Sequence, residues 1–286
     1  MNDPASNSNS SSNNERTSLS LIMRLKIEHT TTFTYDQLIS EAYTEMRLKP
    51  LDAGGQRCLS FHLVTEPQDT VLKYTDHFGN DVHHFDIVQS HQKMVVAATS
   101  EVLTADQYSA DPSGLSPLDE FNYLSPTLYA PHTAELIHFF ASHHQDKDPL
   151  GSALAIMQAI HDMLIYEQGA TDVKTTADQA LALGRGVCQD FSHIMLAACR
   201  TQGLPARYVS GYLYNNGHTA ASHSWVDVLV PDRGWVSLDP THNREQTGQY
   251  VRVAVGRDYG DVPPTRGIFK GNAKEKMDAQ VLVNAL

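Results

Sequence analysis

The segment that follows the N-terminal tail alternates between apolar and polar positions, which is the pattern of half-buried strands. Leu25, Ile27 and His29 fall on one side of the first such segment, and the same period of two recurs further along, for example at 42–48. Clusters of turn-forming residues separate these segments. Short alternating segments between turns predict an antiparallel β-sandwich-like domain over residues 22–104.

The period changes in the second half of the chain. Apolar residues spaced by three and four predict helices, and Thr176 with Gln179 forms a capping box for a short helix that ends near Leu183. Period-two patterns then return, which makes a helical subdomain followed by a sheet, an α+β layout. The other predicted helices lie at 136–140, at 150–164 and from Cys188 to near Gly203, and the predicted strands at 206–214, 222–230, 234–239, 250–255 and 279–283.

Composition divides the chain into four parts. Residues 1–21 are rich in Ser and Asn and have too little apolar content to fold, so we expect a disordered tail. Repeated prolines mark 105–131 as a linker, whose aromatic side chains are expected to pack along the surface. The catalytic domain is expected over 132–286, after the β domain at 22–104.

Charge and cysteine content exclude several classes of protein. The formal net charge is −12, which argues against a nucleic-acid partner because such partners need a basic face. No apolar run reaches the length of about 18 residues expected of a membrane span. Three widely spaced cysteines in 286 residues do not make a disulfide framework, and the N-terminus lacks a secretory signal pattern. We therefore expect a cytoplasmic protein without a membrane partner.

A cysteine at the start of a predicted helix is the first candidate for chemistry. Two glycines precede Cys188 in the run Gly184 to His193, and the apolar helical pattern begins directly after it. The free N–H groups and the dipole of a helix N-terminus favour a thiolate, which is the nucleophilic form. A small buried cysteine is the competing interpretation. Cys199, near the other end of the same helix, is predicted to be a core residue.

A cysteine nucleophile needs a base and a group that orients the base. His223 and Asp239 lie on consecutive predicted strands, joined by a turn at 231–233. If that loop has three residues, the two side chains share one face as diagonal neighbours, with Cα atoms roughly 7–8 Å apart. A loop of two or four residues would place them on opposite faces.

Several motifs resemble one known family. The runs GRGVCQDFSH, LPARYVSGYL, ASHSWVDV, GWVSLDPTHN and VAVGRDYGDVPPTRG look like successive signatures of bacterial transglutaminase-like proteins, within the papain-like cysteine superfamily. The run HFGNDVHHFDI resembles the N-terminal β domain that accompanies this family. The resemblance implies a Cys-His-Asp catalytic triad at Cys188, His223 and Asp239.

The same resemblance implies acyl transfer on a peptide, protein or carboxamide through a thioester, by amide or peptide hydrolysis or by transfer to an amine acceptor. The backbone N–H of Cys188 would contribute to the oxyanion hole. Tyr166 is the candidate second donor, and Trp225, next to His223, is a candidate wall of the site. Each has a plainer interpretation, as a surface aromatic and as a core residue. No cofactor or metal is expected.

Other interpretations stay open. Asp190 could orient the site or only complement the helix dipole. The run Gly256 to Tyr259 could line the rim of the cleft or clamp a loop against it, and the structural role is favoured. A metal-dependent hydrolase is the second option because the chain has 15 histidines, including His83, His84, His143, His144, His218, His223 and His242. No paired-ligand zinc motif accompanies them. A non-catalytic peptide-binding module on the same fold is the third option.

Overall fold

The structure, a computed structural model, describes residues 22–106, 115–141, 148–215 and 222–286. The expected disordered tail, residues 1–21, lies outside these ranges. Among the helices that are described, none has the length and apolar content needed to cross a bilayer.

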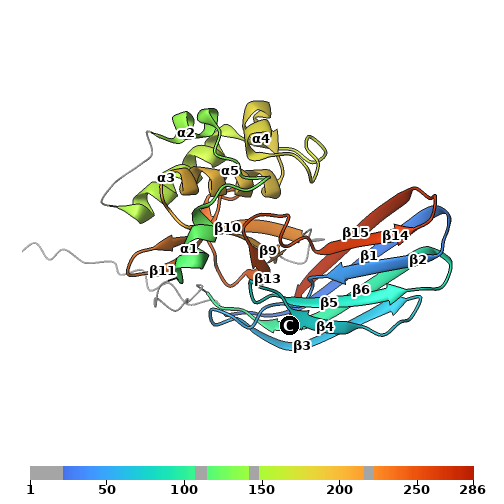
Figure 1. Ribbon diagram of the computed structural model, residues 1–286. Coiled ribbons are helices and arrows are strands. Elements are labelled where there is room, and N and C mark those ends of the chain that lie inside the picture. The colour runs from blue at the N-terminus through green and yellow to red at the C-terminus, as the bar shows by residue number, and fades with distance from the viewer. Residues whose placement is uncertain (1–21, 107–114, 142–147, 216–221) are drawn as a thin grey trace, which may run out of the picture.

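Two antiparallel sheets of four strands each form a β-sandwich (Figure 1). Their strands are β1 (Arg24–Ile39), β2 (Glu41–Met46), β3 (Arg57–Glu66), β4 (Leu72–Thr75), β5 (Asp81–Ile87), β6 (His91–Leu103), β14 (Thr265–Lys270) and β15 (Glu275–Ala285). One sheet has the order β15-β1-β6-β3 and the other β14-β2-β5-β4. Inward-facing residues of both sheets form the core between them, including Phe33 and Val96 from the first and Phe85 and Ile87 from the second. The predicted sandwich is confirmed.

The last two strands of the chain belong to this sandwich. β15 pairs with β1 from Leu25↔Ala285 to Tyr35↔Glu275, and β14 pairs with β2. The sequence-based division gave all of 132–286 to the catalytic domain, whereas residues 265–285 complete one edge of each sandwich sheet. Periodicity identified a strand near 279–283 but carries no information about which strand it pairs with.

A separate antiparallel sheet of five strands supports the second unit. Its order is β12-β11-β10-β9-β13. These strands are β9 (Ala206–Leu213), β10 (Ser222–Val230), β11 (Gly234–Asp239), β12 (Arg244–Glu245) and β13 (Tyr250–Gly256), and four of the five were predicted from the period-two pattern. Val230 pairs with Gly234, so the loop between β10 and β11 has three residues, 231–233.

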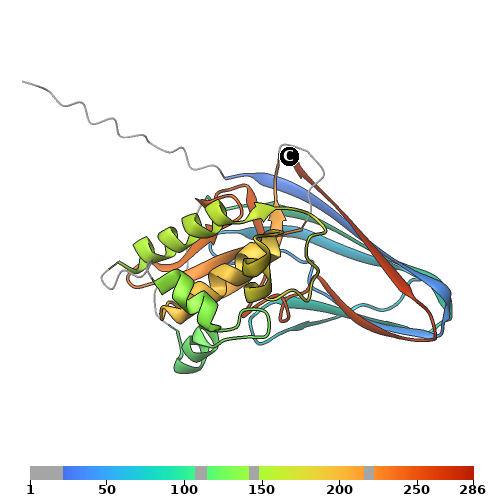
Figure 2. The same cartoon turned by 90° about the horizontal axis from the view of Figure 1, so that it is seen from above.

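Helices cover one face of this sheet (Figure 2). They are α1 (Pro117–Leu124), α2 (Ala134–Phe140), α3 (Pro149–Met163), α4 (Ala177–Leu183) and α5 (Cys188–Thr201), and two short parallel strands, β7 (Ile165–Tyr166) and β8 (Arg185–Gly186), lie beside α4 and α5. α5 packs on β9 and β10, and the other helices surround it. Every residue from 189 to 200 is therefore buried.

The five-stranded sheet also packs against the sandwich, at one end of β9 and β13. Leu25 and Ile27 of β1 lie in one apolar cluster with Tyr212, Val251 and Val253 of β9 and β13. β1 thus packs against the five-stranded sheet through its first residues and inside the sandwich through its later ones. The shared long strand fixes the sandwich close to the second unit.

The expected linker at 105–131 contains a helix, α1, which the sequence analysis did not predict. Ser116 caps it and Pro117 opens it. Tyr123 is buried edge-on against Trp235, and Tyr129 stacks on His193, whereas Phe121 is exposed. The expectation that linker aromatics pack against the domain is confirmed for Tyr123 and Tyr129, and Tyr108 lies outside the described residues.

Candidate active site

Cys188 is the first residue of α5, as the sequence pattern predicted. Val187, directly before it, has an extended backbone and connects β8 to α5. In this first turn the Asp190 N–H donates to the Val187 carbonyl at 2.8 Å, whereas the N–H groups of Cys188 and Gln189 come too early in the helix for an acceptor within it. Cys188 is partly exposed, whereas Cys199 is fully buried in the core, as expected.

Asp190 caps this turn. Its Oδ2 accepts hydrogen bonds from the Val187 N–H at 2.7 Å and from the Thr171 hydroxyl at 2.7 Å. Burial raises the pKa of Asp190, partly offset by these two hydrogen bonds. Gly186 lies so close that a Cβ there would be 2.7 Å from the Asp190 Cγ. The position of the Asp190 carboxylate leaves no room for a side chain at residue 186, so a glycine is required there.

His223 and Asp239 share a face of the β10–β11 hairpin. The pairing Val226↔Leu238 and the three-residue loop give the register that the sequence analysis required. His223 Nε2 lies 2.8 Å from Asp239 Oδ2. A carboxylate can only accept hydrogen bonds, so Nε2 carries the proton and Nδ1 is the nitrogen available to Cys188.

The Asp239 carboxylate is fully buried and has further donors. Its Oδ2 also accepts from His242 Nδ1 at 2.8 Å and from the Tyr250 hydroxyl at 2.6 Å. Its Oδ1 accepts from the backbone N–H groups of Thr241 and His242. Burial alone would raise the pKa of Asp239, but these donors and the charge of His223 hold it well below its ordinary value. Asp239 is therefore a fixed negative charge behind His223.

The electrostatics favour a thiolate–imidazolium pair. Burial alone would raise the pKa of Cys188, but hydrogen bonds from His223 and Ser224 and the charge of His223 hold it below its ordinary value. Burial likewise acts to lower the pKa of His223, yet its hydrogen bonds with Asp239 and Cys188 and their charges raise it to about 10. Each member of the pair stabilises the charged form of the other.

A cavity of about 220 Å³ opens over Cys188 and His223. Tyr166 lines it, is half exposed and lies close enough for the charge of Cys188 to help raise its pKa, after the larger effect of burial. The wall also includes Gln168 and Tyr259, which the sequence analysis did not consider as site residues.

Trp225 does not line this cavity, which corrects the expectation that it walls the site. Its side chain is fully buried, stacked at 6.1 Å on the far side of the His223 ring and edge-on against Tyr250. It belongs to an apolar cluster with Val209 and Val255. Trp225 supports His223 from behind, which is the core role that was its plainer interpretation.

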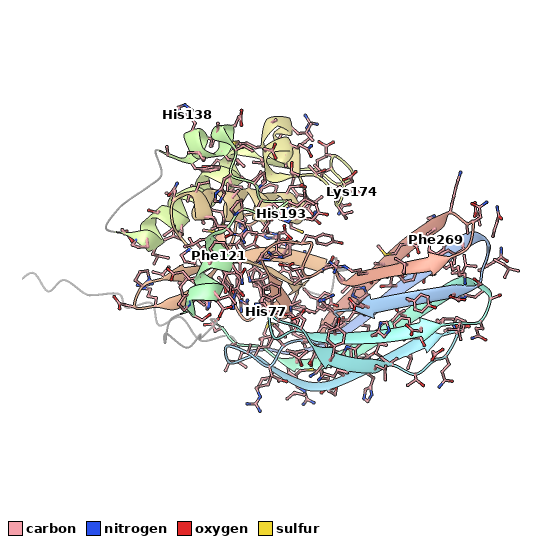
Figure 3. The ribbon with its side chains drawn as sticks, in the orientation of Figure 1. His77, Phe121, His138, Lys174, His193 and Phe269 are labelled. Atoms are coloured by element: carbon pink, nitrogen blue, oxygen red, sulfur yellow. The ribbon has the colours of Figure 1, made fainter. Side chains whose placement is uncertain are left out.

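The run Gly256 to Tyr259 has both of the roles considered for it. Asp261 holds Arg257 through the backbone and the guanidinium, and Asp258 accepts hydrogen bonds from Tyr129 and Gly260. The Tyr259 N–H donates to the buried His193 Nε2 at 3.2 Å, which places the Tyr259 ring at the cavity. Figure 3 labels His193 at the centre of the second unit, on α5.

One group of side chains in the described part of the chain has the composition of a metal site. His223, Asp239 and His242 each offer a ligand atom, and these atoms lie within 4.8 Å of one another. His223 Nε2 and His242 Nδ1 both donate to Asp239, so a metal ion bound through these nitrogens would have to displace both protons. His83 and His84 lie on β5 in the sandwich, and His143, His144 and His218 lie outside the described residues.

Sequence reasoning missed Tyr250 and the role of His242. His242 follows Asp239 by three residues in a tight turn, and that spacing is a local signal that could have placed it. Tyr250 comes from β13, beyond β9 in the sheet, and only the strand order brings it to Asp239.

Comparisons with known proteins agree with this arrangement. Residues 140–240 match the model of the transglutaminase-like superfamily, and residues 25–103 match that of the bacterial transglutaminase-like N-terminal region. An uncharacterized protein of Mycobacterium leprae is 32% identical over 281 residues, covering 92% of this chain and 99% of that protein.

Two further relatives are more distant. A protein-glutamine gamma-glutamyltransferase of Pseudomonas aeruginosa is 28% identical over 124 residues, covering 38% of this chain and 19% of that protein. The crystal structure of a "putative cysteine protease" from Cytophaga hutchinsonii superposes with a TM-score of 0.76 at 22% identity, covering 93% of this chain and 92% of that one. The second comparison shows that the two proteins share a fold.

Proposed function

Because the chain belongs to the transglutaminase-like superfamily, we propose that it is a cysteine-dependent enzyme that transfers acyl groups from peptide or carboxamide substrates through a thioester on Cys188. The observation that carries the proposal is the chain of contacts from Cys188 through His223 to the buried Asp239.

The proposed reaction has two steps. The Cys188 thiolate attacks the carbonyl carbon, and the oxyanion is held by the backbone N–H of Cys188, with the Tyr166 hydroxyl as the second donor. The C–N bond breaks, the amine leaves with the proton of His223, and an acyl thioester remains. His223 then removes a proton from water, whose oxygen attacks the thioester, and the C–S bond breaks to release the acid and the thiolate.

Water is the acceptor that we propose, so the reaction is amide or peptide hydrolysis. Transfer to an amine uses the same thioester and differs only in the second nucleophile, and the gamma-glutamyltransferase relative makes it the alternative outcome of the test. The three cysteines are free, which fits a protein that works in the reducing cytoplasm, as we further propose.

The first experiment is alkylation of the native protein with an alkyne-bearing iodoacetamide near neutral pH. We expect Cys188 to react first, because burial raises the pKa of Cys199 to about 12 and also raises that of Cys58. Cys188→Ala should abolish this labelling, and Cys199→Ala should leave it unchanged. Equal labelling of wild type and Cys188→Ala would favour the non-catalytic peptide-binding module.

The second experiment incubates the protein with peptide and amine libraries and identifies products by mass spectrometry, with Cys188→Ala as the control. Hydrolysed products support the proposal, and amine adducts would identify a transferase. A chelator should leave turnover unchanged. Loss of turnover on chelation together with resistance to alkylation would instead identify a metal-dependent hydrolase that uses His223, Asp239 and His242.

A further inference from the structure

A second and larger cavity, of about 730 Å³, lies between the sandwich and the catalytic unit. Its catalytic wall includes Lys174 and Tyr259, and its other walls come from the ends of the two sandwich sheets. In Figure 3 Lys174 lies on the catalytic side of this opening and Phe269, on β14, on the sandwich side. The volume falls within the range of about 300–1,000 Å³ typical of ligand sites, whereas the 220 Å³ cavity over Cys188 lies below it.

The two cavities share a wall. Tyr259 lines both, and the neighbours Pro263 and Pro264 line the larger and the smaller one. Gln189, which follows Cys188 and lines the smaller cavity, donates from its amide to the carbonyl of Val173, which lines the larger one. The two cavities are therefore adjacent, so a substrate whose carbonyl lies at Cys188 has the larger cavity beside it.

The larger cavity runs along a free strand edge. β14 is the outermost strand of its sheet, and four consecutive residues, 265–268, line the cavity. Side chains alternate between the two faces of a strand, so consecutive residues line one cavity only where it follows the backbone edge. Arg47 N–H donates to the Pro264 carbonyl, and antiparallel alternation then turns the N–H and C=O groups of Thr265 and Gly267 toward the free edge.

The rim of this cavity is cationic although the protein carries a net charge of −12. Lys174 and Arg266 line it, and within the described residues neither forms an ion pair. Arg266 donates to the Gly260 carbonyl. Asp261 is the acidic group near Arg266, and it forms an ion pair with Arg257 at 2.8 Å. Among the described residues that line the wall, Glu275 is the one carboxylate, and it accepts a hydrogen bond from the Tyr35 hydroxyl.

We propose that this cavity binds the substrate as an extended, acidic peptide segment that adds as a strand to the free edge of β14, with its carboxylates at Lys174 and Arg266. Strand addition provides main-chain hydrogen bonds, and the cations select the side chains. This proposal rests on the proposed function, since it treats the segment as part of the substrate that acylates Cys188.

The test measures binding rather than turnover, so that its failure is distinguishable from failure of the proposed function. Full-length Cys188→Ala is titrated into three fluorescein-labelled decapeptides that share one central Gln: one with flanking Glu, one with flanking Lys, and the Glu peptide methylated on alternate backbone nitrogens. We expect the Glu peptide to bind at least about tenfold more tightly than either of the others, because like charges and lost strand hydrogen bonds each weaken binding.

Charge-reversed variants locate the site. Lys174→Glu and Arg266→Glu should each remove the preference for the Glu peptide, and the double variant should favour the Lys peptide. Lys276→Glu is the matched control, because Lys276 is an exposed lysine on β15 that does not line the cavity. Equal binding of Glu and Lys peptides, or an equal loss in Lys276→Glu, would overturn the charge assignment.

Unchanged binding of the methylated peptide would overturn strand addition to β14. If Cys188 is alkylated selectively while the peptides bind equally, only the cavity proposal fails. If the Glu peptide binds selectively while no cysteine is activated, the binding site stands and the enzymatic function fails.

Discussion

His242 Nδ1 lies 2.8 Å from Asp239 Oδ2, the same oxygen that receives the proton-bearing nitrogen of His223. The candidate orienting carboxylate is therefore shared between two imidazoles, one buried and one exposed. The ring centroids of His223 and His242 are 5.2 Å apart. His242 is in a position to influence how firmly Asp239 holds His223 without itself lining the cavity.

We predict that His242→Leu lowers kcat about tenfold and leaves KM unchanged. A hydrogen bond to a charged group contributes about 1.5 kcal/mol, and a loss of that size in orienting Asp239 corresponds to roughly a factor of ten in rate. Steady-state kinetics on a substrate found with the peptide library measures the effect. His242→Asn, which keeps a donor at the same place, should recover most of the activity, and equal losses in both variants would contradict the positioning role.

The pH at which Cys188 becomes reactive toward iodoacetamide should depend on His223. Removing His223 leaves burial as the main influence, which raises the pKa of Cys188. In His223→Ala the rise in iodoacetamide reaction rate should therefore move to higher pH than in wild type, where His223 holds the pKa of Cys188 below its ordinary value. Asp239→Asn should move it in the same direction, because His223 loses a charge that raises its pKa. A profile that stays in place in both variants would contradict the ion pair.

Two glycines near Cys188 should respond differently to alanine. A Cβ at Gly186 would collide with the Asp190 carboxylate and displace the cap of α5, so Gly186→Ala should reduce both the alkylation rate of Cys188 and the free energy of unfolding. Gly184 has a positive φ of 67° but open space around it. Gly184→Ala should cost about 1 kcal/mol of stability, from backbone strain, and leave the alkylation rate unchanged. Equal effects on alkylation in the two variants would contradict the role of Asp190.

Stability in acid should depend on His29. This buried residue of β1 contacts the hydroxyl of Tyr212, on β9, at 2.8 Å. Burial lowers the pKa of His29 to about 4, whereas the unfolded chain has the ordinary value of 6.5. The unfolded state therefore binds more protons between these values, so stability falls as pH decreases from 6.5 to 4.

For His29 that loss amounts to about 3 kcal/mol, from 1.36 kcal/mol for each unit of pKa difference. Thermal melting of His29→Gln should show a smaller fall in Tm between pH 6.5 and 4 than wild type. His77→Gln, which changes an exposed histidine, should melt with the wild-type pH dependence. Parallel pH dependence in wild type and His29→Gln would remove His29 as the cause.

Local features of the site could be predicted from the sequence. The apolar spacing after Cys188 identified the start of α5, and the alternation around His223 and Asp239 fixed which residues share a face once the loop had three residues. These features depend on neighbours in sequence and on one tight turn, which are the scales on which periodicity carries information.

Features that depend on strand order could not be predicted. Tyr250 reaches Asp239 because β13 lies next to β9, and Trp225 is covered because β13 supplies Tyr250 over it. The alternation that places Trp225 beside His223 does not say whether that face is open. The cavity along β14 was equally out of reach, because no local pattern shows that residues 265–270 pair with β2.

The pairing of β14 and β15 with β2 and β1 makes the transglutaminase-like unit an insertion within the β domain. During synthesis, β14 and β15 leave the ribosome only after the whole transglutaminase-like unit, so the sandwich cannot be completed before then. Vectorial folding of the N-terminal part by itself would expose the unpaired edges of β1 and β2. A recombination event that exchanges the β domain between two relatives must therefore transfer two separate segments, residues 22–104 and residues 265–285. Transfer of the first segment alone would leave the sandwich with edge strands from the other parent.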